Sequence, residues 1–310
     1  MTGVSHSDMA RAIDWCTSVL GPVALLSDDS KAHGGHESST CRLRTPAGPC
    51  YLKVHHTAGH WHNEVHAYER WAGAFGDFAP RLLAVRDREP LALVVSVLPG
   101  QIVERAALSR AQQRAVWRGA GAALIALHDL GPGECFGPRR RDGSCAEPYP
   151  REARQAVALR LGREIERAVA GQYLSPRELA TVRAAAERAA VFEGERPLPC
   201  HRDYCAANWL ASPQGTWAGV IDFEFAHWDV RVADFSRDPD WTWIRRPDLV
   251  GAFFEGYGRP LMAVEEEQLL VARAEYALGA ILWGRDHAFY GFEQEGREAL
   301  AHLAPLLTSG

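Results

Sequence analysis

Lysine is almost absent from this chain. Of its 34 basic residues only Lys31 and Lys53 are lysines, and the others are arginines. This bias indicates a GC-rich coding sequence that favours arginine, alanine and glycine throughout, so a lysine kept against that background prompts the question of what it does. Lys53 lies inside the apolar segment 50–54, which has the composition of a β-strand.

Long hydrophobic runs, a strong net charge and paired cysteine motifs are also absent. The longest near-continuous apolar run, Leu91 to Leu98, is far too short to span a bilayer, so we expect no membrane partner. A net charge of −5 gives no electrostatic reason to expect a nucleic-acid partner. Seven cysteines form no Cys-x-x-Cys pair and cannot all pair internally, and residues 1–10 are too polar for a signal peptide. We expect a reducing cytoplasm.

The remaining composition is that of an ordinary globular protein. At 310 residues, with 47% hydrophobic and 24% charged side chains, the chain is long enough for two lobes that each have a core. A Pro-Gly break at 99–100 coincides with a change in composition. It predicts an N-terminal nucleotide-binding lobe over 1–98 and a C-terminal catalytic and substrate-binding lobe over 99–310.

The N-terminal lobe is predicted to be small, rich in β-strands and to carry one helix. Short strands are expected at 22–30 and 39–56, and a further pair at 81–86 and 91–98. Apolar residues with helical spacing run from 61 to 74.

The C-terminal lobe is predicted to be mainly helical. Ser109 opens a helix with a capping-box pattern, and Ser175 opens another with proline at its first position. Glycine and proline at 131–150 indicate a loop, short β segments return at 198–226, and residues 247–307 are expected to form two or more helices.

Two strings in the C-terminal half carry the parts that phosphoryl transfer needs. They are His-Arg-Asp-Tyr-Cys-Ala-Ala-Asn at 201–208 and Ile-Asp-Phe-Glu at 221–224. Asp203 would orient and deprotonate a hydroxyl, while Asn208 and Asp222 would hold Mg²⁺ on the nucleotide phosphates. Asp and Asn commonly form turns, so each alone is unremarkable evidence, but the order and spacing of all three indicate a kinase.

Two neighbours of these residues are interpreted as structural. His201 is expected to shape the catalytic loop rather than to transfer protons. Asp234 is expected to orient the backbone of that loop, and a contact with the substrate is the less favoured alternative.

The upstream residues would form a phosphate-binding side. The Lys53 ammonium could hold the α- and β-phosphates, with Glu64 on the following helix keeping it in place. A lysine whose stem packs while its head reaches solvent is the alternative. Gly34 and Gly35, followed by Ser38, lie between two predicted strands, where glycines let backbone N–H groups approach phosphates. A simple hairpin turn would explain the same string.

Two further clusters have simpler explanations. Five histidines lie between 55 and 66, but the zinc motif His-Glu-x-x-His is absent because Asn63 follows His62. Histidines that flank a surface loop explain them better. Acidic and indole side chains at 228–243 could bind a cationic or ring-shaped substrate, and buried tryptophan with solvated aspartate explains them equally well.

Together these residues resemble the aminoglycoside phosphotransferase and choline kinase-like family, which shares the protein-kinase fold. The resemblance runs from the first strands to Asp234 and is most specific at 198–237. It implies an α+β two-lobe fold, ATP or GTP as phosphate donor, Mg²⁺, and a small-molecule hydroxyl as acceptor. The matching positions are the phosphate-binding Lys53 with Glu64, the catalytic Asp203, the metal ligands Asn208 and Asp222, and the purine-gripping linker from Ser96 to Leu98.

The chain also departs from the protein kinases. Cys205 stands where they have a lysine two residues after the catalytic aspartate, and Glu224 stands where they have the glycine of Asp-Phe-Gly. No Ala-Pro-Glu string follows, so a protein substrate is disfavoured. The form of the glycine segment leaves ATP and GTP both open.

The resemblance implies an antibiotic as the leading acceptor. Aminoglycosides come first, and nucleoside or peptide antibiotics, as in the self-resistance of a producer, follow closely. The alternatives are a metabolic kinase acting on choline, an amino alcohol or a sugar, and a catalytically silent nucleotide-binding pseudokinase.

Overall fold

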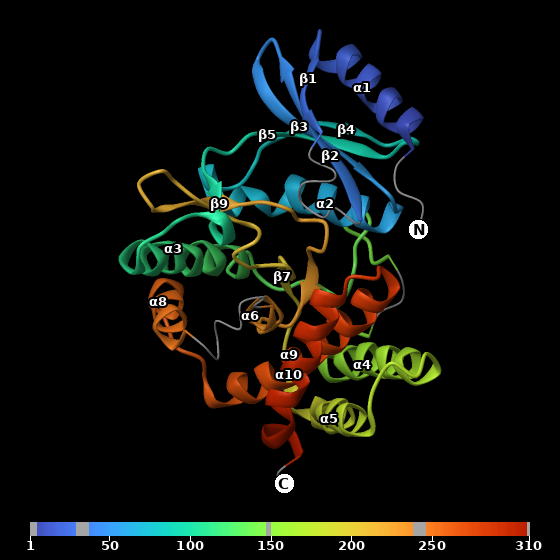
Figure 1. Ribbon diagram of the computed structural model, residues 1–310, viewed down its shortest axis with the longest axis vertical. Coiled ribbons are helices and arrows are strands. Elements are labelled where there is room, and N and C mark those ends of the chain that lie inside the picture. The colour runs from blue at the N-terminus through green and yellow to red at the C-terminus, as the bar shows by residue number, and fades with distance from the viewer. Residues whose placement is uncertain (1–4, 29–36, 147–149, 238–245, 309–310) are drawn as a thin grey trace.

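The computed structural model describes residues 5–28, 37–146, 150–237 and 246–308. Its strands β1 to β5 and helices α1 and α2 form the upper part of the molecule, and the helices from α3 (Arg110–His128) onward form the lower part (Figure 1). The expected α+β, two-lobe fold is confirmed. The lobe boundary at 98/99 stays a prediction. Strand β6 (Gln101–Ile102) follows it closely and pairs with Leu210 and Ala211.

The upper part is an antiparallel sheet with two α-helices, where the sequence predicted one. Its strand order is β1-β2-β3-β5-β4, built from β1 (Ala24–Asp28), β2 (Ser38–Thr45), β3 (Gly48–His55), β4 (Leu82–Arg86) and β5 (Ala92–Ser96). The expected helix is α2 (Ala58–Arg70), which a 3₁₀ segment, η1 (Ala72–Phe78), follows. The unexpected one, α1 (His6–Leu20), is capped by the Ser5 side chain. It buries Ala12 and Cys16 fully, and Met9 and Ile13 pack against the same small core.

The lower part is mainly helical, as expected. Its helices are α3 (Arg110–His128), α4 (Ala153–Ala170), α5 (Pro176–Glu187), the short α6 (Ala233–Ser236), α8 (Pro247–Tyr257), α9 (Ala263–Asp286) and α10 (Tyr290–Thr308), with 3₁₀ turns η2 (Val103–Arg105) and η3 (Arg188–Phe192). Short strands form two small sheets: β7 (Leu198–Cys200) with β10 (His227–Asp229), and β6 with β8 (Trp209–Ala211) and β9 (Trp217–Val220). The predicted helix starts at Ser109 and Ser175 are both confirmed as capping boxes.

The core explains why β5 reads as a continuous apolar run. Leu93 and Val95 belong to the large core that extends into the helical part, whereas Ala92 and Val94 belong to a smaller core under α1. Alternate residues of a strand face opposite sides of a sheet, so a strand covered on both sides needs apolar residues at every position. The sheet is thus held between α1 and the rest of the molecule.

The loop between α3 and α4 connects α2 to the lower part through a hydrogen bond and an ion pair. A disulfide joins Cys135 to Cys145 in this loop. The Arg139 N–H donates to Asn63 Oδ1 at 3.1 Å, and the Arg141 guanidinium pairs with Glu69 at 2.6 Å. The sequence analysis predicted the loop but not the disulfide, which a reducing cytoplasm would keep as two thiols.

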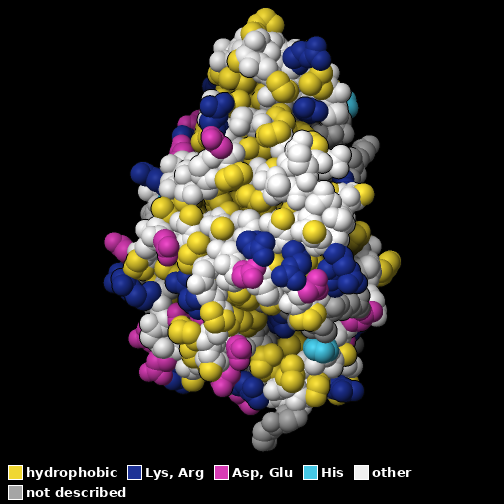
Figure 2. Space-filling view, turned by 90° about the vertical axis from the view of Figure 1, so that its left-hand side faces the viewer, with side chains coloured by type: hydrophobic (Ala, Val, Ile, Leu, Met, Phe, Trp, Pro, Cys, Tyr) yellow, Lys and Arg dark blue, Asp and Glu magenta, His cyan; other side chains and the backbone are white. Residues whose placement is uncertain are grey.

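The lower part of the molecule carries surface charge of both signs. On the face in Figure 2, basic and acidic side chains are interspersed over the lower part of the molecule. Within the ranges that the structure describes, no helix is both long and apolar enough to cross a membrane.

Candidate active site

Lys53 lies at the centre of a buried group of carboxylates. Its Nζ is 2.9 Å from Glu64 Oε2, 2.5 Å from Asp222 Oδ1 and 2.9 Å from Glu224 Oε2. Burial favours the neutral amine, but the three negative charges outweigh it and raise the pKa of Lys53 well above its usual value. The ammonium is therefore permanently charged, and the structure joins three of the predicted site residues, Lys53, Glu64 and Asp222, at one point.

Glu224 is the member of this group to which the sequence analysis assigned no role. Its Oε2 accepts a hydrogen bond from Ser38 Oγ at 3.0 Å as well as the contact with Lys53. Burial and the nearby charge of Asp222 raise the pKa of Glu224 to about 7, against the opposing effect of Lys53. Ser38 thus lies beside the predicted phosphate-binding lysine, and both side chains contact the same carboxylate oxygen.

Strands β8 and β9 bring the two predicted metal ligands together. Asn208 directly precedes β8 and Asp222 follows β9, and these strands pair antiparallel with Trp209 opposite Val220. The pairing continues through the Ile221 N–H, which donates to the Asn208 carbonyl at 3.0 Å. The two side chains therefore leave the sheet at the same end.

The donor set suits Mg²⁺. The Asn208 amide nitrogen donates to the Asp203 carbonyl at 3.0 Å and to Asp203 Oδ2 at 2.8 Å, which turns its amide oxygen away from those contacts. An amide oxygen beside the Asp222 carboxylate is the all-oxygen ligation that Mg²⁺ prefers. Asp222 has a positive φ of 69°, so its backbone is held in a conformation uncommon for non-glycine residues.

Asp203 is buried and bonded at both carboxylate oxygens. Asn208 donates to Oδ2, and the Arg237 guanidinium forms an ion pair with Oδ1. Cys205 Sγ lies 3.6 Å from the same Oδ1. Arg237 follows α6, and nothing in the sequence analysis distinguished it from the many other arginines.

The catalytic loop is held from below by Asp234, as the sequence analysis interpreted it. Asp234 accepts the His201 N–H at 3.0 Å and the Arg202 N–H at 2.6 Å, and His128 Nε2 lies 3.0 Å from its Oδ2. Arg202 has a positive φ of 66°, which such a double contact helps to maintain.

His201 shapes the loop from its other side. Its Nδ1 accepts the Asp203 N–H at 3.3 Å, so its Nε2 is the donor to the Ile221 carbonyl at 3.1 Å. Burial lowers its pKa, which keeps the ring neutral.

The remaining predicted nucleotide-binding residues are spread more widely. Gly34 and Gly35 lie outside the described residues. The Ser96 N–H donates to the Arg81 carbonyl at 2.9 Å. Leu98 follows the end of β5, and its side chain packs closely against Gly219. A Cβ added to Gly219 would lie 2.8 Å from it. Their roles stay predictions.

The histidines of the 55–66 segment each have a separate partner rather than a common centre. His55 Nε2 lies 3.0 Å from Glu64, His60 pairs with Glu37 at 3.3 Å, and His62 accepts the Arg141 N–H at 3.2 Å. His55, Glu64 and Glu224 do converge closely enough for a metal ion, but the Lys53 ammonium already contacts both carboxylates.

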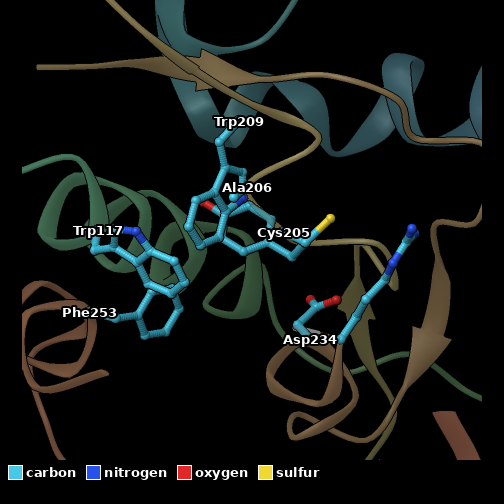
Figure 3. A pocket seen from close by; sticks show the side chains of 8 residues that line it. Trp117, Cys205, Ala206, Trp209, Asp234 and Phe253 are labelled. Atoms are coloured by element: carbon cyan, nitrogen blue, oxygen red, sulfur yellow. The ribbon is translucent and has the colours of Figure 1, made fainter. Parts of the chain in front are cut away.

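A small cavity lies behind the catalytic loop. It is lined by Trp117, Tyr204, Cys205, Ala206, Trp209, Asp234, Arg237 and Phe253. Figure 3 shows the rings of Trp117, Trp209 and Phe253 together on one side, with the Cys205 sulfur pointing away from them. Its volume of about 10 Å³ is what one water molecule needs, so it is no acceptor pocket.

Comparison with known proteins agrees with this geometry. A sequence model described as the phosphotransferase enzyme family matches residues 30–268, which include both lobes and every residue of the Lys53 and Asp203 groups. The chain belongs to the phosphotransferase enzyme family. As a member it is an enzyme that transfers phosphate to a hydroxyl. A search of curated proteins found no match.

Solved structures of phosphotransferases share the fold. A thermostable mutant of the aminoglycoside phosphotransferase APH(4)-Ia has a TM-score of 0.71 at 15% identity, covering 96% of this chain and 100% of that one. The GDP complex of aminoglycoside 2'-phosphotransferase-IIIa has a TM-score of 0.68 at 14% identity, covering 97% and 99%. A further relative, described as a putative aminoglycoside phosphotransferase from Ralstonia eutropha, has a TM-score of 0.66 at 14% identity, covering 96% and 97%. At these identities the likeness shows the fold alone.

Proposed function

We propose that this phosphotransferase is Mg²⁺-dependent and moves the γ-phosphate of ATP or GTP to a hydroxyl of a small molecule. The observation that carries the proposal is the contact between Lys53 of β3 and Asp222 after β9, 2.5 Å apart although the two residues are 169 positions apart in the chain. Such a pair, beside Asn208 and Asp203, is the arrangement in which phosphoryl transfer rests on positioning and charge. We place the enzyme in the cytoplasm, where these nucleotides occur.

Each residue has a defined task in this proposal. Lys53, held by Glu64, binds the α- and β-phosphates, and Asn208 and Asp222 hold the metal ion. Bound Mg²⁺ supplies positive charge to the phosphate oxygens. Asp203 orients the acceptor hydroxyl and accepts its proton. Ser38, Gly34, Gly35 and the linker from Ser96 to Leu98 would complete the nucleotide site.

An antibiotic is the leading acceptor, and aminoglycosides come first among the candidates. Structures of similar fold include APH(4)-Ia with AMP-PNP and hygromycin B, and APH(2")-IIa with gentamicin. These complexes concern those proteins. They support an aminoglycoside here only as the first compound class to test.

A nucleoside or peptide antibiotic is the second candidate, and a specific observation favours it. Two half-buried aromatic side chains lie next to Arg237, the partner of Asp203. The Arg237 guanidinium carbon is 6.0 Å from the centre of the Phe292 ring, and the centres of the Phe292 and Trp283 rings are 5.4 Å apart. Trp283 Nε1 then donates to Glu37 at 3.4 Å. A guanidinium next to the catalytic carboxylate disfavours a polycationic acceptor, whereas half-buried aromatic rings suit a flat, uncharged one.

A mass-shift screen tests the proposal. The enzyme is incubated with Mg²⁺ and ATP or GTP and with aminoglycosides, nucleoside and peptide antibiotics, choline, amino alcohols and sugars, and the products are examined for one added phosphate. We expect one antibiotic class to be phosphorylated, and Asp203→Ala to abolish the product while the nucleotide still binds. Phosphorylation of choline or a sugar alone would favour the metabolic alternative. Nucleotide binding with no turnover of any acceptor or of the nucleotide would favour a pseudokinase.

A further inference from the structure

Arg237 lies against Asp203, the carboxylate that we assign as the catalytic base. Its guanidinium pairs with Asp203 Oδ1, while Oδ2 accepts from Asn208 at 2.8 Å. Asp203 is 5% exposed and the Arg237 side chain is 23% exposed, so the guanidinium is the more accessible member of the pair. A cation is therefore stationed beside the reacting centre without belonging to the predicted catalytic strings.

The surroundings of Arg237 hold its stem but leave donors unused. Its guanidinium carbon lies 6.0 Å from the centre of the Phe292 ring of α10. It also faces the phenol of Tyr276 on α9, which lies beside Glu295. The Arg237 Nε is buried and has no hydrogen-bond partner among the described residues. A guanidinium offers five N–H donors in a planar fork, so one can serve a second anion.

The charge distribution shows where a second anion would sit. Lys53 lies on the donor side, bound to three carboxylates, and Cys205 stands where the protein kinases have a lysine after the catalytic aspartate. The acceptor side thus lacks that cation, yet negative charge accumulates on the transferred group as its bonds change. Arg237 lies beside Cys205 at Asp203 Oδ1 and can supply it.

We propose that Arg237 moves from the Asp203 carboxylate to the transferred phosphoryl group and serves as an arginine finger supplied by the same chain. The inference rests on the proposed function. In the step that it assists, the acceptor oxygen forms a bond to the γ-phosphorus, and the hydroxyl proton passes to Asp203. The bond from the γ-phosphorus to the β–γ bridging oxygen breaks, and its electron pair stays on the departing diphosphate. When Arg237 leaves Asp203, Oδ1 is free to act as the base.

Arg237→Gln tests this role without knowledge of the acceptor. The first measurement is the slow hydrolysis of ATP or GTP by water, and the second is calorimetric binding of Mg·ADP (or Mg·GDP) with and without aluminium fluoride, which mimics the transferred group. We expect kcat to fall by roughly 10²–10³-fold. The affinity for the Mg·diphosphate should change less than about threefold, and the gain in affinity from aluminium fluoride should disappear. Arg237→Lys, which keeps the charge without the planar fork, should recover part of both effects.

Arg118→Gln is the matched control, because Arg118 pairs with Glu255 on the exposed surface and should leave all three values unchanged. The inference is overturned if Arg237→Gln hydrolyses nucleotide normally and still gains affinity from aluminium fluoride. It is also overturned if affinity for the Mg·diphosphate falls in parallel with hydrolysis, since that pattern indicates nucleotide binding or folding. If the unaltered enzyme binds no Mg·diphosphate at all, the proposed function fails first and the inference falls with it.

Discussion

Replacement of Lys53 by alanine should destabilise the fold as well as abolish activity. The substitution leaves Glu64 and Glu224, which are 1% and 6% exposed, without their cation. Removing one partner from a buried ion pair costs about 3–5 kcal/mol, because the remaining charge stays buried. For a chain of this size such a loss lowers Tm by roughly 5–10 °C.

The loss should depend on pH, and its sign follows from Glu64. With Lys53 present, the ammonium holds the pKa of Glu64 at about 2 in spite of its burial. Without it, burial raises that pKa above the value in the unfolded chain, so the folded protein takes up a proton that the unfolded chain releases. Stability then falls as pH rises. The deficit of Lys53→Ala should therefore be largest near pH 8 and shrink towards pH 5.

Denaturation by heat or urea at pH 8 and pH 5 measures this effect. The double variant Lys53→Ala, Glu64→Gln should be more stable than Lys53→Ala at pH 8, because it removes the orphaned charge. Arg11→Ala breaks an exposed pair with Asp8 and is the control, with a change within about 0.5 kcal/mol. A Lys53→Ala protein as stable as the parent at pH 8, or a deficit equal at both pH values, would refute the reasoning.

Three further predictions concern other parts of the molecule. Burial and the charge of Glu275 raise the pKa of Glu164 to about 8, although Arg160 opposes the shift. The free energy of unfolding should therefore fall between pH 4.5 and 8. In a series of denaturation curves across this range, Glu164→Gln should make that fall smaller. Gly121→Ala should destabilise the fold by several kcal/mol, because its Cβ would lie 2.0 Å from a backbone oxygen of α8. Gly162→Ala has open space around its Cβ and should stabilise α4 by up to about 1 kcal/mol. Asp234→Asn should cost roughly 2 kcal/mol and lower kcat more than nucleotide affinity, since an amide cannot accept all three loop hydrogen bonds; an unchanged kcat would contradict this.

The elements that the sequence predicted well are those whose signal is local. The catalytic string at 201–208 lies within one loop, and the helix starts at Ser109 and Ser175 depend on residues three positions apart. Helix α1 was not predicted, although its apolar residues at 9, 12, 13 and 16 have helical spacing. Its position over the sheet is decided by tertiary packing.

The site was predictable where a residue type was scarce and not where it was common. Lys53 was conspicuous because lysine is rare in this chain. Arg237 is one of many arginines and meets Asp203 only through the path of the chain around α6, which spacing cannot reveal. Glu224 was recognised as a departure from the protein kinases, but its contact with Lys53 crosses 171 positions and required the fold.

The loop that ties α2 to the lower part bears on how such an enzyme can be controlled. Asn63, one residue before Glu64, accepts the Arg139 N–H and lies 3.4 Å from the Glu224 carbonyl, while Glu69 on the same helix pairs with Arg141. In kinases that are switched on and off, displacement of this helix separates the glutamate from the lysine. Here the middle and the C-terminal end of the helix contact residues 139–141 and the chain after β9, so the salt bridge between Lys53 and Glu64 forms without a ligand. The rate of the reaction would then depend on the concentrations of nucleotide, acceptor and enzyme.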